Sequence, residues 1–180
     1  MSRRLRPPGR RAWLACLLAA CAGLFSAPGA AQYADLDRAD WQEDPVPPPP
    51  AYSLERLLEI DMPKTASVRM GIDPQTLSVN HQSGVVRYVV VARGTSAVNA
   101  SYEGIRCTTG EFRVYARQVQ GGEWTPSTDS GWKSMRGQSS VLVQHPLRLA
   151  RDGLCLGPSA RQTVSEMVRE LKTGNRSLYY

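Results

Sequence analysis

Residues 84–119 hold three strand-like runs in succession, and this stretch constrains the fold more than any other. The first run, residues 85–91, is almost continuously apolar and β-branched, which is typical of a strand buried on both faces. In the second run the apolar residues alternate and then change phase after Gly104, so we expect a β-bulge there. The third run is predicted to place Phe112, Val114 and Ala116 on one face and Arg113, Tyr115 and Arg117 on the other. Short connections between the runs predict an antiparallel meander.

The N-terminal 31 residues have the pattern of a secretory signal peptide. Met1 to Arg11 carries five arginines and no acidic residue, and an apolar run follows from Ala12 to Phe25. Two processing routes fit this pattern. Cleavage after Ala31 gives a mature chain that begins at residue 32, whereas Leu18-Ala19-Ala20-Cys21 matches a bacterial lipobox and makes residues 1–20 the signal, with lipid on Cys21. The expected location is therefore the periplasm, or the outer membrane as a lipoprotein, of a Gram-negative bacterium.

Removal of this segment changes the charge of the chain. The whole sequence has 22 basic and 16 acidic residues, a net charge of +6. Five of the basic residues lie in the signal, which leaves 17 against 16, a net charge of +1. The basic balance is thus no indication of nucleic-acid binding, and no nucleic-acid partner is expected.

Cysteine usage agrees with export. Cys16 lies in the signal and Cys21 is removed or lipidated, so Cys107 and Cys155 remain in the mature chain. Two cysteines in an oxidising compartment predict a disulfide, although two buried free thiols are the alternative. Their separation excludes the CxxC arrangement of thiol oxidoreductases. Closing a loop of this length would stabilise the fold by roughly 4 kcal/mol in the chain-entropy model.

The mature chain divides into a linker and one domain. Residues 32–51 are acidic and then proline-rich, which predicts an extended linker. Residues 52–180 are predicted to form a single α+β domain, in which an antiparallel sheet meander is packed by a C-terminal helix and held by one disulfide. A strand over residues 68–72 is expected to turn at residues 73–76 and return through Leu77 and Val79. The helix is expected to begin near Pro158, to end at a C-cap glycine and to present an apolar face made of Val164, Met167, Val168 and Leu171.

No pattern for catalysis, metal binding or a cofactor is found in the sequence. The only histidines, His81 and His145, have no second ligand at metal spacing, and we expect both to be solvent-exposed. No GxSxG elbow and no glycine-rich phosphate loop is present. Glu103 and Arg106 are expected to form surface or cross-strand charge pairs. Trp124 and Trp132 flank a polar loop, where they either anchor a satellite core or stack on a ligand such as a glycan.

Several stretches together carry a family resemblance. In order they are Asp-Trp-Gln-Glu with a proline run, Gly-Val-Val-Arg-Tyr-Val-Val-Val, and Val-Asn-Ala-Ser-Tyr-Glu-Gly-Ile-Arg-Cys with a tryptophan-containing tail. The sequence from Trp41 to Gly174 therefore resembles the cryptic-neisserial-protein-like family, most specifically at residues 99–107. The resemblance implies a small bacterial envelope protein, often expected to be a lipoprotein, with no established activity. It supplies no catalytic residues.

Two functions remain as hypotheses. The first is a non-enzymatic envelope protein that binds an envelope protein or another ligand through the basic, aromatic strand face of Arg113, Tyr115 and Arg117. Membrane anchoring through lipid at Cys21 fits this hypothesis. The second is a periplasmic hydrolase with a polar site that the sequence alone does not bring together, from Tyr102, Glu103, Arg106 and His81.

Overall fold

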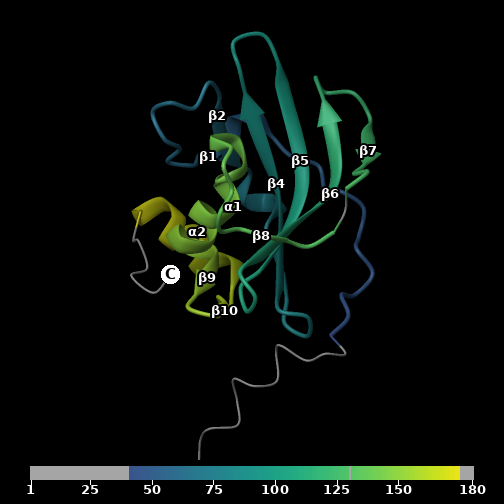
Figure 1. Ribbon diagram of the computed structural model, residues 1–180, viewed down its shortest axis with the longest axis vertical. Coiled ribbons are helices and arrows are strands. Elements are labelled where there is room, and N and C mark those ends of the chain that lie inside the picture. The colour runs from purple at the N-terminus through teal and green to yellow at the C-terminus, as the bar shows by residue number, and fades with distance from the viewer. Residues whose placement is uncertain (1–40, 130, 175–180) are drawn as a thin grey trace, which may run out of the picture. The chain divides into compact units, whose positions relative to one another are not determined.

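The computed structural model describes residues 41–129 and 131–174, and all of these belong to one compact unit (Figure 1). The predicted signal, both predicted processing sites and Cys21 lie outside the described residues. Among the residues that are described, no helix is both long enough and apolar enough to cross a bilayer.

An antiparallel sheet forms the centre of the unit. Its strands are ordered β1-β2-β4-β5-β6-β7, while β3 pairs with β4 and β8 pairs with β6. The strands are β1 (Leu58–Glu59), β2 (Arg69–Ile72), β3 (Ser78–Asn80), β4 (Val85–Arg93), β5 (Val98–Arg106), β6 (Glu111–Val119), β7 (Trp124–Pro126) and β8 (Lys133–Ser134). A 3₁₀ turn, η1 (Leu54–Arg56), precedes β1. The predicted meander is confirmed, since β4 pairs with β5 and β5 with β6 along nearly their full lengths.

The segment after β2 does not return along β2 as predicted. A 3₁₀ turn, η2 (Pro74–Thr76), replaces the expected type I turn, and β3 continues in the direction of β2. Both short strands therefore pair with β4, one after the other. The reason is the hydroxyl of Thr76, which accepts a hydrogen bond from the backbone N–H of Val89 at 2.9 Å and fills the gap between them. Buried Asp73 caps the turn and pairs with Arg56 at 2.7 Å.

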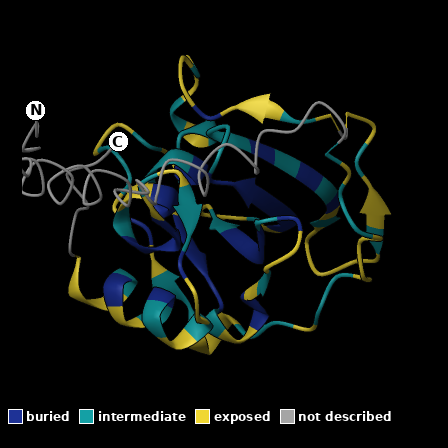
Figure 2. Cartoon of the chain, turned by 90° about the horizontal axis from the view of Figure 1, so that it is seen from below, coloured by how far each residue is buried: buried dark blue, intermediate teal, exposed yellow. Residues whose placement is uncertain are grey.

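The two faces of the sheet are both covered, as the apolar run in β4 predicts. Val86, Tyr88 and Val90 of β4 belong to a cluster on one face, which we call the helical face. Val89 and Val91 belong to a second cluster on the opposite face. Residues Trp41–Ala51, which we call the strap, run over this second face, hereafter the strap face. Figure 2 shows the buried strands at the centre and exposed residues on the outer side of the helices.

The helical face is packed by the C-terminal third of the chain. Its elements are η3 (Val141–Val143), α1 (His145–Leu149), the π-helical turn η4 (Ala150–Leu154), β9 (Cys155–Leu156), β10 (Ser159–Ala160) and α2 (Val164–Thr173). Pro158 does not start the last helix as expected, because it lies in the turn between β9 and β10. Thr163 is the N-cap instead, and its side chain accepts a hydrogen bond from the N–H of Glu166 at 3.1 Å. Gly174 is the predicted C-cap, with a φ of 62°.

The predicted disulfide is confirmed. Cys107, directly after β5, is bonded to Cys155 at the start of β9, with 5.8 Å between their Cα atoms. Both cysteines are buried in the cluster of the helical face. The bond therefore joins the central strand of the meander to the segment that leads into α2.

Candidate functional site

A bulge in β6 determines which side chains reach the strap face. Tyr102 is opposite Ala116 and Glu103 is opposite Val114, so Tyr115 is the additional residue. The bulge thus lies in β6, whereas the sequence predicted one at Gly104 in β5. Gly104 has another role: a Cβ atom there would lie 2.3 Å from the Tyr115 hydroxyl. The glycine leaves room for the Tyr115 ring to lie against the sheet.

The predicted binding face is only partly assembled. Arg113 and Tyr115 lie together on the strap face. Arg117 lies on the helical face, because the bulge reverses the alternation of side chains after Tyr115. It is in register with Ser101, whose hydroxyl contacts Glu103 in that layer, and its positive charge acts on His145. The prediction that three alternate residues share one face was therefore wrong for Arg117.

The strap is anchored at its first residue. The indole N–H of Trp41 donates a hydrogen bond to the carbonyl of Ser83 at 3.0 Å. The guanidinium carbon of Arg106 lies 3.9 Å from the centre of the Trp41 ring, and Trp132 meets this ring edge-on at 5.8 Å. Part of the predicted linker is therefore bound to the domain. Local composition did not indicate this, because prolines and acids are typical of segments that do not pack.

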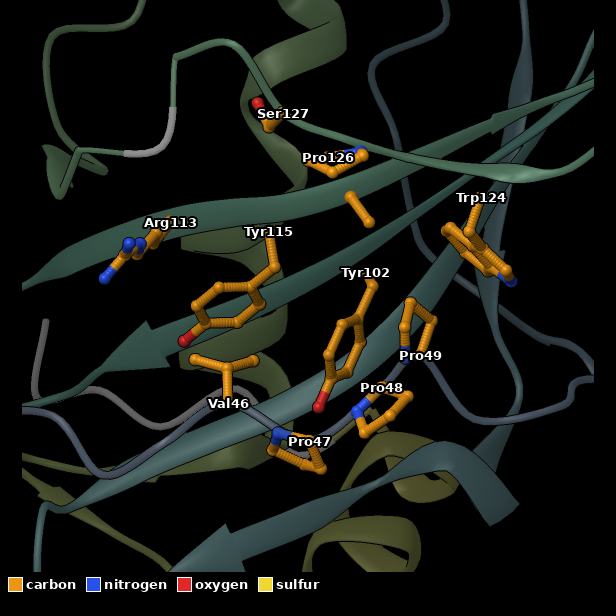
Figure 3. Close-up of a pocket in the computed structure, with 11 residues that line it drawn as sticks. Val46, Pro47, Pro48, Pro49, Tyr102, Arg113, Tyr115, Trp124, Pro126 and Ser127 are labelled. Atoms are coloured by element: carbon orange, nitrogen blue, oxygen red, sulfur yellow. The ribbon is translucent and has the colours of Figure 1, made fainter.

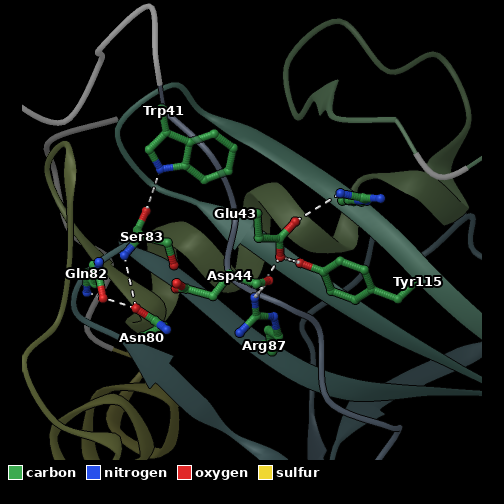
Figure 4. Close-up of polar contacts among 9 residues, drawn as sticks. Trp41, Glu43, Asp44, Asn80, Gln82, Ser83, Arg87 and Tyr115 are labelled. Atoms are coloured by element: carbon green, nitrogen blue, oxygen red, sulfur yellow. Dashed lines mark hydrogen bonds and ion pairs between the residues drawn. The ribbon is translucent and has the colours of Figure 1, made fainter.

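The second anchor is Glu43, whose carboxylate is buried beneath the strap (Figure 4). It accepts hydrogen bonds from Arg87 at 2.8 Å, from Arg113 at 3.0 Å and from the hydroxyl of Tyr115. Burial lowers the pKa of Arg87, but the interactions with Glu43 and Tyr115 raise this pKa by a larger amount. The net change in the pKa of Arg87 is therefore upward. Burial and the Glu43 carboxylate raise the pKa of Tyr115 far above its usual value. Tyr115 therefore stays neutral, and its hydroxyl donates a hydrogen bond to Glu43.

A groove of about 460 Å³ lies between the strap and the sheet (Figure 3). Tyr102 and Tyr115 form its aromatic centre, with their ring centroids 5.3 Å apart. Arg113 stands at one end and Trp124 at the other, where Trp124 also packs edge-on against Tyr52. The remaining lining residues are Val46, Pro47, Pro48, Pro49, Ala116, Pro126 and Ser127. Trp124 thus packs on the domain, as its predicted anchoring role requires, and also lines the groove, while stacking on a ligand stays a prediction.

At the far end of the groove, Tyr52, the residue directly after the strap, provides a third attachment. The hydroxyl of Tyr52 donates a hydrogen bond to the side-chain carbonyl of Gln118 at 2.6 Å. Between this point and Glu43, residues 45–48 are exposed to solvent. The strap is therefore a bridge that is held at both ends and spans a groove.

A buried polar cluster lies on the helical face. Glu103 accepts hydrogen bonds from Ser101 at 2.5 Å and Tyr88 at 3.2 Å, and lies 2.7 Å from Nε2 of His145. Nδ1 of His145 donates to the carbonyl of Leu142 at 2.9 Å. Burial raises the pKa of Glu103, but His145 and the two hydroxyl donors lower this pKa by a larger amount, so the net change is downward. Burial lowers the pKa of His145, but the charge and hydrogen bond of Glu103 raise this pKa by a larger amount. Both shifts favour the charged forms, so the pair is ionic.

The expectations for these polar residues are settled individually. His145 and Glu103 are 4% and 1% exposed, so the predictions of an exposed histidine and a surface glutamate were wrong. The two residues are 42 positions apart in sequence, and no local sequence pattern indicates that they form a pair. His81 is exposed as predicted, in the turn before β4. Arg106 forms the predicted cross-strand pair, 3.9 Å from Glu111.

The residues named for a hydrolase do not converge. Tyr102 lines the groove on the strap face, whereas Glu103 is buried on the opposite face with His145. Arg106 contacts Trp41 and Glu111, and His81 is in an exposed turn. Within residues 41–129 and 131–174, no three histidine, cysteine or acidic side chains form a group that could hold a metal ion.

Comparison with known proteins places the chain in a family. Neither a curated protein nor a solved structure matches it. The sequence pattern of the CNP1-like family matches residues 36–172, which include the strap from Trp41, the whole sheet and most of α2. This is the family that the sequence resemblance indicated. The chain therefore belongs to the CNP1-like family.

Proposed function

We propose that this protein is a non-enzymatic binding domain of the bacterial envelope, and that its groove takes an extended peptide segment of a partner protein. The observation that carries the proposal is the groove itself, with tyrosines at its centre, prolines along one side and Trp124 at one end. Aromatic rings and proline walls suit an extended backbone with apolar or proline side chains, because such a backbone is already ordered before it binds.

The chemistry of the lining favours a peptide over a glycan. Sugar hydroxyls need several hydrogen-bonding side chains, whereas most of the groove lining is aromatic, aliphatic or proline. Its one charged residue, Arg113, stands at the end opposite Trp124. A peptide with an acidic residue at the Arg113 end is complementary in charge.

Two features support the proposed location in the envelope. The basic and apolar pattern of residues 1–25 is typical of a signal peptide, and Cys107–Cys155 is the kind of bond that persists in an oxidising compartment. Two locations follow from the two processing routes: a soluble periplasmic domain after cleavage at Ala31, or a domain anchored by lipid at Cys21. The intact mass of the exported protein distinguishes these routes by its first residue and any added lipid.

The binding proposal is tested with a synthetic peptide. The probe is acetyl-Glu-Pro-Pro-Val-Pro-Pro-amide, titrated into the exported protein by calorimetry, beside a second peptide with lysine in place of glutamate. We expect the glutamate peptide to bind more tightly than the lysine peptide. Trp124→Ala should weaken binding by at least about tenfold, since aromatic anchors carry much of the energy of such sites.

A matched control separates the groove from general apolar contact. Leu142 is an exposed apolar residue outside the groove lining, so Leu142→Ala should leave the dissociation constant unchanged. If Trp124→Ala and Leu142→Ala bind the peptide equally well, or if no binding is detected at millimolar peptide, the groove is not the binding site and the proposal fails.

A further inference from the structure

The donors that hold Glu43 belong to the rigid part of the domain. Arg87 lies on β4, and Arg113 and Tyr115 lie on β6, so two long strands that both pair with β5 hold all three. Their donors converge on a single carboxylate, with two guanidinium groups and one hydroxyl. Guanidinium groups match the planar geometry of a carboxylate. The arrangement on the sheet is therefore a complete receptor for one carboxylate.

The acceptor comes from a segment that is held much less firmly. The strap forms no helix or strand, so it has no backbone ladder to the sheet. Gln42 beside Glu43 is exposed, and exposed prolines follow. Within the described residues, Trp41 is the only anchor on the N-terminal side of Glu43. Glu43 is accordingly comparable to a ligand on a tether.

The receptor cannot remain empty at low cost. Without Glu43, the buried guanidinium of Arg87 would lose its carboxylate, and a buried charge without a partner is strongly unfavourable. The Nε atoms of Arg87 and Arg113 are buried and lack acceptors even with Glu43 in place. The site therefore demands an anion from some source whenever the strap moves away.

We infer that Arg87, Arg113 and Tyr115 form a carboxylate-binding site that Glu43 fills within the chain and that an acidic side chain of a bound peptide fills in its place. This inference rests on the proposed peptide function of the groove. Arg113 belongs both to the carboxylate site and to the groove, because it donates a hydrogen bond to Glu43 and also lines the groove. A glutamate at the end of a peptide in the groove thus has Glu43 as its direct competitor. The strap regulates the groove because its Glu43 occupies the site that receives the acidic residue of the peptide.

Acetate is the probe for the site itself. In Glu43→Ala, we expect sodium acetate to raise the melting temperature with saturation, by several degrees more than the same concentration of sodium chloride. The wild-type protein should respond equally to the two salts, because its site is filled. Glu59→Ala is the matched control: it removes a carboxylate from the exposed pair with Arg69, and should show no preference for acetate.

The outcomes are separable. Glu43→Gln keeps the shape of the side chain, and it takes the place of Glu43→Ala if that variant does not fold. Equal responses to acetate and chloride in whichever variant folds overturn the carboxylate site, as does an acetate preference of the same size in the wild type. The glutamate peptide should bind the Glu43 variant at least tenfold more tightly than it binds the wild type. If acetate stabilises the variant but no peptide binds, the site stands and the groove proposal fails.

Discussion

The two faces of the sheet are buried by different means. The helical face is covered by α1, η4 and α2, is closed by the Cys107–Cys155 bond and encloses the ionic pair of Glu103 and His145. The strap face is covered by a segment without regular structure, which leaves a groove under it. A face closed by packed helices and a disulfide opens only when the domain unfolds, whereas a strap without regular structure, held by side chains alone, can open locally. We therefore propose that the helical face contributes mainly to stability and that the strap face binds the partner.

The largest effect is expected from variants that lack the disulfide on the helical face. In Cys107→Ala with Cys155→Ala, the free energy of unfolding should fall by about 4 kcal/mol, because the unfolded chain regains the entropy of an open loop. Urea unfolding measures the loss. The dissociation constant of the peptide from the folded protein should stay within about twofold of the wild-type value, since the groove is on the other face. A larger change would show that the two faces are coupled.

The second effect breaks the ionic pair. Glu103→Gln leaves buried His145 without its carboxylate, and we expect a loss of about 3 kcal/mol in urea unfolding. Glu59→Gln is the control, because it breaks an exposed pair with Arg69 and should cost less than about 1 kcal/mol. If both variants lost similar amounts of unfolding free energy, burial of Glu103 would not explain the contribution of its ion pair to stability.

The third effect acts on the strap face. Gly104→Ala forces the Tyr115 hydroxyl, one of the donors to Glu43, out of its position. The expected cost is about 2 kcal/mol from overpacking, with faster hydrogen exchange of the Trp41 indole N–H. Gly131→Ala adds a methyl group that meets nothing within 4 Å, and it should behave as the wild type does. Unchanged indole exchange in Gly104→Ala would contradict the link between Tyr115 and the strap.

The smallest effect is a dependence on pH. The folded-state pKa of His145 lies above its ordinary 6.5, so its contribution is complete below pH 6.5 and is lost as the pH rises through the raised value. The pKa of Glu103 lies below its ordinary 4.5, so its contribution is complete above pH 4.5 and is lost as the pH falls. Stability from the pair should be greatest between pH 4.5 and pH 6.5 and should fall at higher and at lower pH.

Urea unfolding at several pH values measures this dependence. Glu103→Gln should remove it, whereas His81→Gln should retain it, because His81 is exposed. A slope that survives in Glu103→Gln would assign the pH dependence to another group.

Local signals in the sequence were sufficient for much of the fold. The continuous apolar run of β4 indicated burial on two faces, and the turns around it indicated the meander. Two cysteines in a chain with a signal-peptide pattern indicated the disulfide. Gly174 indicated the end of α2 because the residue after a helix often needs a positive φ. In each case, the composition of a few neighbouring residues carries the information.

The candidate site could not be predicted in the same way. When both faces of a sheet are buried, apolar residues occur in both phases, and the bulge at Tyr115 leaves no interruption in the pattern. Glu43 lies 70 residues from Arg113 and 72 from Tyr115, in a segment whose composition indicates disorder. Trp41 was the one available signal, since a tryptophan in a polar, proline-rich segment needs a place to bury its ring.

The long sequence separation of the strap contacts has a consequence for how the chain folds. Trp41 and Glu43 are synthesised before β4 and β6, yet their binding site does not exist until those strands have paired with β5. Contacts between distant residues form slowly, because a long loop must close first. We therefore expect the residues of the strap that are made first to complete their contacts last. Newly made molecules would then pass through a stage in which the sheet is formed and its strap face is still uncovered.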